Sequence, residues 1–105
     1  MTNGIREIMI RRVRVTENHK PFEIQIGRFV QPAWLAITHA TGKNVESFNL
    51  VFFANDGSPI DWCQYDTLQI AMDQAHAMVG VERSAWERCN AEITNDNEKI
   101  RWEDT

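Results

Sequence analysis

The sequence lacks long apolar runs. The longest are five residues each, AWLAI and LVFFA, whereas a helix that crosses a membrane needs about 20 apolar residues. The first residues, MTNGIREIMIRR, do not follow the basic-then-apolar order of a secretory signal. We therefore expect a single domain over residues 1–105 that enters no membrane and resides in the cytoplasm.

Cysteine is also scarce, since only Cys63 and Cys89 occur in 105 residues. Small secreted scaffolds of this size normally carry more cysteines at closer spacing. The sequence therefore predicts two reduced, partly buried thiols, and a disulfide or a reactive thiol is the alternative.

Motifs for catalysis and metal binding are missing. The sequence contains no HExxH or CxxC group, no nucleophile elbow and no phosphate-binding glycine loop. Asp73 and His76 lie three residues apart, but a metal site needs three or four convergent ligands. Cys63 lies between Asp61 and Asp66 rather than beside the basic group that activates a thiolate. These gaps predict no metal site, no cofactor and no assembled set of catalytic residues.

What the sequence does contain is strand patterning in its first half. Alternating apolar residues predict four antiparallel strands, at residues 8–15, 21–30, 34–41 and 44–53. Gly42-Lys43 suits the loop of a hairpin between the third and fourth strands. This loop would place Leu35 opposite Leu50.

The first strand is rich in arginine. Its apolar phase switches at Arg11-Arg12, which indicates a bulge and leaves Arg11, Arg12 and Arg14 facing water. A hairpin with the second strand would place Arg14 opposite Glu23. The arginines are therefore interpreted as the solvated side of a strand.

The second half contains the clearest helix signal. Asp66 and Gln69 match a capping box, and Gly80 suits the helix end, so a helix is predicted at about 67–79. Its apolar stripe consists of Leu68, Ala71, Met72, Ala75 and Val79.

The end of the chain is predicted to form a last hairpin with its turn at Asp96-Asn97. A short helix that begins at Ser84 is the alternative for the first part of this segment. The sum is an α+β fold, an antiparallel sheet of four to six strands with one main helix packed on one face.

Charge divides the chain into two unequal parts. Residues 1–43 carry seven basic and three acidic side chains, whereas residues 44–105 carry four basic and twelve acidic ones. Nucleic-acid affinity comes mainly from cations that neutralise phosphates, and the net charge here is −4. We therefore expect no nucleic-acid partner.

Four tryptophans are many for this length: Trp34, Trp62, Trp86 and Trp102. Most are expected in the core, but Trp34 shares a strand face with Val51 and Phe53 where a solvated face would be polar. Either the helix or the last hairpin covers this side, or it is an exposed apolar patch that another chain covers.

The favoured hypothesis is a non-enzymatic protein-binding domain with a basic partner, and a homodimer is possible. Acidic residues and tryptophans would form its surface: Trp34, Val51, Phe53, Asp61, Trp62 and Asp66. Small acidic immunity proteins have a similar general profile of size, charge and element order, although no motif carries this likeness.

The alternative hypothesis is a small-ligand binder or enzyme with a pocket between sheet and helix. Its candidate groups are His39, Cys63, Tyr65 and His76, which could perform acid–base or nucleophilic chemistry if they converge.

Overall fold

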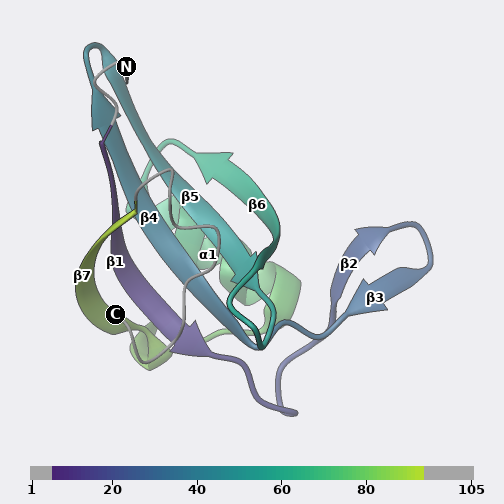
Figure 1. Ribbon diagram of the computed structural model, residues 1–105. Helices are drawn as coiled ribbons and strands as arrows, with labels where there is room; N and C mark the ends of the chain where they lie inside the picture. The colour runs from purple at the N-terminus through teal and green to yellow at the C-terminus, as the bar shows by residue number, and fades with distance from the viewer. Residues whose placement is uncertain (1–5, 94–105) are drawn as a thin grey trace.

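The strands of the computed structural model are β1 Arg6–Arg14, β2 Phe22–Gln25, β3 Arg28–Val30, β4 Trp34–Gly42, β5 Val45–Phe53, β6 Pro59–Tyr65 and β7 Glu87–Ile93. The structure describes residues 6–93. Five strands form one antiparallel sheet in the order β6-β5-β4-β1-β7. Helix α1, Leu68–Val79, lies across one face of this sheet, and β2 and β3 form a separate ribbon that projects beside it (Figure 1). The expected α+β class is confirmed.

Strand β1 contains the predicted bulge. Its register shifts between Met9 and Arg11 on both neighbouring strands, so the bulge lies at Ile10, just before the predicted position. Because the bulge adds one residue, Ile10 and Val13 both pack in the cluster beneath α1. Met9 points to the opposite face and is fully buried.

The predicted hairpin between β1 and β2 is wrong. Strand β1 lies between β4 and β7, so both of its edges are occupied by other strands. Strand β2 instead turns at Gly27, with φ of +76°, and pairs with β3. Glu23 consequently accepts a hydrogen bond from the Gly27 N–H at 3.2 Å rather than facing Arg14.

The ribbon of β2 and β3 is anchored to the core through one aromatic contact. The Phe22 ring stacks on Phe52 with centroids 3.9 Å apart. In addition, the Lys20 N–H donates to the Val79 carbonyl at the end of α1, at 2.7 Å. The ribbon therefore stands on the helix side of the sheet.

The hairpin of β4 and β5 is present with a different loop. Lys43 and Asn44 form its tip, since Gly42 pairs with Val45 and Asn44 has φ of 61°. Leu35 therefore lies opposite Phe52 rather than Leu50. A two-residue shift keeps every side chain on its predicted face because side chains alternate along a strand.

Helix α1 begins one residue later than the predicted cap implies. The Thr67 hydroxyl accepts a hydrogen bond from the Ile70 N–H at 3.1 Å, so Thr67 is the N-cap and the predicted role of Asp66 is wrong. Gly80 ends the helix in the left-handed conformation, as expected. No helix within residues 6–93 is long and apolar enough to cross a bilayer.

The segment after α1 returns to the far edge of β1. A single 3-10 turn, Arg83–Ala85, stands where the short helix from Ser84 is predicted, and strand β7 follows. Strand β7 matches the first strand of the predicted last hairpin, and the turn at Asp96-Asn97 lies outside the described residues.

Two apolar clusters lie on the two faces of the sheet. One joins α1 to the sheet through Ala71, Ala75 and Val79. The other, on the opposite face, is built on Trp34, which is 2% exposed and stacks on Phe53 with centroids 4.1 Å apart. Trp34 is therefore buried, on the face that α1 does not occupy.

Candidate functional site

The end of the sheet formed by β6 carries the most exposed tryptophan of the described chain. Trp62 is 57% exposed, whereas Trp34 and Trp86 are buried. Strand β6 has no neighbour beyond it among the described strands. Trp62 lies opposite Val51, on the same face of the sheet as Phe53 and Trp34. We call Asp61, Trp62, Gln64 and Asp66 the β6 edge.

The backbone of the β6 edge is open at two residues. The Trp62 N–H donates to the Asp61 carboxylate at 2.8 Å, so it points away from β5. Residues of an antiparallel strand point their N–H and C=O groups alternately to one side and the other. Gln64 therefore presents its backbone groups on the same open side as Trp62, whereas Cys63 faces β5 between them.

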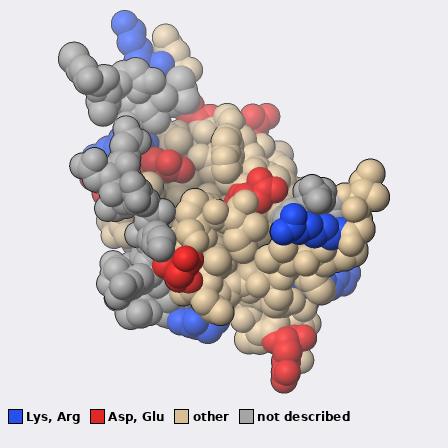
Figure 2. All heavy atoms as spheres, turned by 45° about the vertical axis from the view of Figure 1, so that its right-hand side comes forward, with Lys and Arg blue, Asp and Glu red and all other residues tan. Residues whose placement is uncertain are grey.

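The segment of the chain that supplies the β6 edge carries charge of one sign. Residues 44–82, which supply β5, β6 and α1, contain no lysine or arginine. The acidic residues of this segment are Glu46, Asp56, Asp61, Asp66, Asp73 and Glu82. Figure 2 shows the side of the molecule toward β6, where acidic side chains are spread over a largely uncharged surface that also carries some basic side chains. The exposed Trp62 ring is therefore accompanied by carboxylates that come from its own segment of the chain.

The six predicted contact residues divide into two groups. Asp61, Trp62 and Asp66 lie in or directly after β6, and Trp62 and Asp66 are exposed. Trp34 and Phe53 are buried and Val51 is half-buried. These three residues lie on β4 and β5, the strands inside β6, and not on the exposed edge itself. Strand β6 was not predicted from the apolar pattern, and the long segment without lysine or arginine is the sequence signal that marks this end of the sheet.

The four candidate groups of the alternative hypothesis do not converge. Cys63 and Tyr65 are neighbours on β6, and burial, with a hydrogen bond to Cys63, raises the pKa of Tyr65 to about 12. His39 stacks on Phe48, and its Nε2 lies 2.8 Å from a Glu46 carboxylate oxygen.

Phe48 separates these groups, because it lies opposite His39 on one side and opposite Tyr65 on the other. Two strand spacings are about 9–10 Å, too far for one proton transfer between the rings. His76, on α1, lies 3.6 Å from Glu82 instead.

The interface between sheet and helix is filled. Ala71, Ala75 and Val79 are fully buried against the sheet, together with Leu50 and Phe52. Two depressions lined by described residues lie at the surface. One, of about 590 Å³, is lined by Lys20, Pro21, Phe22, Glu23, Phe29 and Met78.

A second depression, of about 430 Å³, is lined by Asp73, His76, Glu82, Arg83 and Ser84. Its charges are paired with one another, Arg83 with Asp73 and His76 with Glu82. Neither depression includes Cys63 or Tyr65. Among the described residues, no three His, Cys, Asp or Glu side chains are grouped so that they could hold a metal ion.

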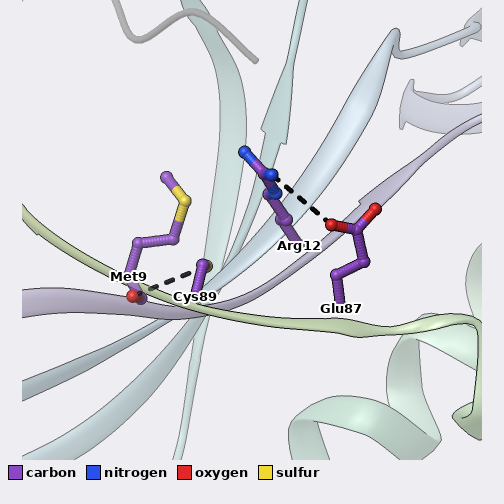
Figure 3. Close-up of polar contacts among 4 residues, drawn as sticks. All are labelled: Met9, Arg12, Glu87 and Cys89. Carbon is purple, nitrogen blue, oxygen red and sulfur yellow. Dashed lines mark hydrogen bonds and ion pairs between the residues drawn. The ribbon is translucent and has the colours of Figure 1, made fainter. Parts of the chain in front are cut away.

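The opposite end of the sheet holds the arginines of β1. Arg12 was expected to face water, but its side chain is only 16% exposed and its Nη2 lies 3.4 Å from Glu87 on β7 (Figure 3). Beside it, the Cys89 thiol donates to the Met9 carbonyl at 3.6 Å. Burial raises the pKa of Cys89, while Arg12 and Arg11 act in the opposite direction. Both cysteines are free thiols, as expected.

No family model, curated protein or solved structure matches the chain. The geometry of the described residues therefore carries the functional argument.

Proposed function

We propose that this chain is a non-enzymatic protein-binding domain that holds a basic partner at the β6 edge. The main support for this proposal is Trp62, whose side chain is 57% exposed on a strand at the edge of the described sheet. Such a domain acts by occupying its partner, in the manner of an immunity-type or accessory protein.

Trp62 is suited to anchor a partner. Tryptophan is among the residues most enriched at binding hot spots, because its large ring gives much contact area and loses little conformational freedom. Trp62 lies opposite Val51, which packs against the buried cluster of Trp34, Ala36 and Phe53. The ring is therefore presented on a strand of the sheet rather than on a loop.

The carboxylates around Trp62 determine the kind of partner. Asp61 and Asp66 flank it, and their own segment of the chain, residues 44–82, contains no lysine or arginine. Complementary charge accelerates association and rejects partners of the same sign. A partner surface with lysine or arginine around an apolar centre fits this site.

Affinity capture with purified wild-type, Trp62→Ala and Phe29→Ala proteins tests the proposal. Phe29 is the matched control, since it is also aromatic, is 59% exposed and lies on β3, outside the β6 edge. We expect wild-type and Phe29→Ala to retain the same basic partner, and Trp62→Ala to bind it about 30-fold less tightly or worse. Equal binding by all three proteins would refute a function at this edge.

A further inference from the structure

We propose that the partner contributes a short, extended basic segment that adds to the sheet as a strand beside β6. This inference rests on the proposed function and specifies how the β6 edge binds. Its basis is the backbone as well as the side chains: Trp62 and Gln64 present N–H and C=O groups away from β5, where the described chain places no further strand.

Asp61 protects this open edge in the free protein. Its carboxylate accepts the Trp62 N–H at 2.8 Å, so one of the two outward donors is occupied by a side chain of the same strand. Native sheets commonly guard exposed edges with charged residues in this way, because an unguarded edge pairs with other chains. The Gln64 N–H lies two residues further along and has the same orientation.

Charge selects the added strand. Two β6 edges brought together would place Asp61 and Asp66 of both copies close to one another, and strand β6 itself contains no lysine or arginine to offset their repulsion. A segment with lysine or arginine instead pairs with these carboxylates, and a cation near Asp61 releases the Trp62 N–H for a backbone bond. The favoured occupant is therefore a basic strand of another protein rather than a second copy.

The geometry also limits the length and pattern of that segment. Strand β6 is seven residues long. A register shift near its first residues and the start of α1 soon after its last residue limit the length over which another strand can pair with it. The added strand therefore alternates over a few residues, with apolar side chains on the Trp62 face and basic ones on the other face.

The direct test uses a capped heptapeptide of alternating lysine and valine, with a valine–glutamate peptide of the same length as control. Titrations are followed by NMR of the isotope-labelled protein, together with amide hydrogen exchange. We expect the lysine peptide to shift the Trp62 and Gln64 amide signals saturably and to slow exchange of the Gln64 N–H, and the glutamate peptide to do neither.

A pair of variants separates backbone pairing from side-chain contact. Gln64→Ala retains the outward N–H. Gln64→Pro removes this N–H and leaves the backbone hydrogen bonds between β6 and β5 in place, because the Gln64 N–H points away from β5. We expect Gln64→Ala to bind the lysine peptide like wild-type, and Gln64→Pro to bind it about tenfold more weakly or worse. Because Gln64→Pro could also disturb folding, the exchange rate of the Gln64 N–H in the wild-type protein provides the independent readout.

Each outcome decides the inference. Peptide binding that depends on Trp62 but leaves Gln64 exchange unchanged overturns strand addition and leaves the proposed function standing. Absence of saturable binding by the lysine peptide also overturns strand addition, whereas the capture experiment with Trp62→Ala decides the proposed function separately. Protection of the Gln64 N–H through dimerisation without peptide would identify a second copy as the occupant and overturn the basic strand.

Discussion

The two ends of the sheet use charge in opposite ways. At the β1–β7 end, arginines of β1 meet glutamates of β7, as in the pairs Arg6–Glu92 at 3.1 Å and Arg12–Glu87 at 3.4 Å. At the β6 end, the carboxylates of Asp61 and Asp66 face no lysine or arginine from residues 44–82. Two glutamates at the first end have arginine partners on the neighbouring strand, whereas the carboxylates at the second end have no basic residue in their own segment of the chain.

The two ends also differ in what their large side chains do. Met9 and Trp34 are buried on the face shared with β7, while Trp62 on β6 is mostly exposed. We infer that the first end serves stability and the second serves recognition. Four measurements test this distinction between the two ends.

The largest effect is expected at Met9. Met9→Ala removes a fully buried side chain from the cluster around Trp34 and leaves a cavity, so the free energy of unfolding should fall by about 2–5 kcal/mol. Urea denaturation followed by circular dichroism measures this loss. A loss below about 1 kcal/mol would show that this end contributes little to stability.

A smaller effect is expected at the Arg12–Glu87 pair. Glu87→Gln removes the carboxylate from a guanidinium that is only 16% exposed, so stability should fall by about 1 kcal/mol. Glu92→Gln is the matched control, because its partner Arg6 is largely exposed, and its cost should be about 0.2–0.5 kcal/mol. Equal costs in urea denaturation would contradict the difference in burial between the two pairs.

At the β6 end, a further effect appears only in alkaline solution. Burial, with Cys63 beside it, raises the pKa of Tyr65 to about 12, whereas a tyrosine in the unfolded chain titrates near 10. Between these pH values the unfolded chain has lost the phenol proton and the folded chain retains it. Stability from this group is therefore complete below pH 10 and declines as pH rises toward 12.

Tyr65 is the only tyrosine, so absorbance of the phenolate reports its titration directly. Tyr65→Phe should remove this part of the alkaline loss in urea denaturation at a series of pH values. A phenolate that titrates near 10 in the folded protein would contradict the burial of this group.

The smallest effect on stability is expected at Trp62. Trp62→Ala should change the free energy of unfolding by about 0.5 kcal/mol or less, because the ring is mostly outside the core. The same substitution should nevertheless weaken partner binding by about 30-fold or more, which is the clearest contrast with Met9. A loss of several kcal/mol in urea denaturation would place Trp62 among the structural residues instead.

Local signals in the sequence predicted several elements well. The stripe of Leu68, Ala71 and Ala75, followed by Gly80, predicts α1. Helical spacing and a left-handed cap both depend only on residues close together in the sequence. The phase switch in β1 likewise predicts a bulge, since an inserted residue changes the alternation at one point.

Pairing partners were predicted less well. Strand β1 pairs with β4 and with β7, at the other end of the chain, although β2 is nearer in sequence. Alternation is equally satisfied by several partners, and the choice depends on which arrangement of all strands buries the most apolar surface. The shifted register of β4 and β5 has a similar origin, because a two-residue slip leaves both faces unchanged.

The candidate site was predicted in part. Trp62, Asp61 and Asp66 are recognisable by residue type, but Trp34 and Trp62 have the same chemistry and opposite exposure. Exposure depends on position in the sheet, since β4 is an inner strand and β6 an outer one. Strand β6 was missed because its seven residues follow a turn, and a bulge at Ile60 interrupts their alternation.

The apolar periodicities, the helix and the uneven distribution of charge follow from the order of residues along the chain, because each of these is a property of neighbouring residues. The order of the strands, by contrast, emerges only when the chain is folded, and with it which tryptophan is buried and which backbone edge is open. That order results from competition among distant pairings of similar local quality, and contacts summed over the whole sheet resolve the competition.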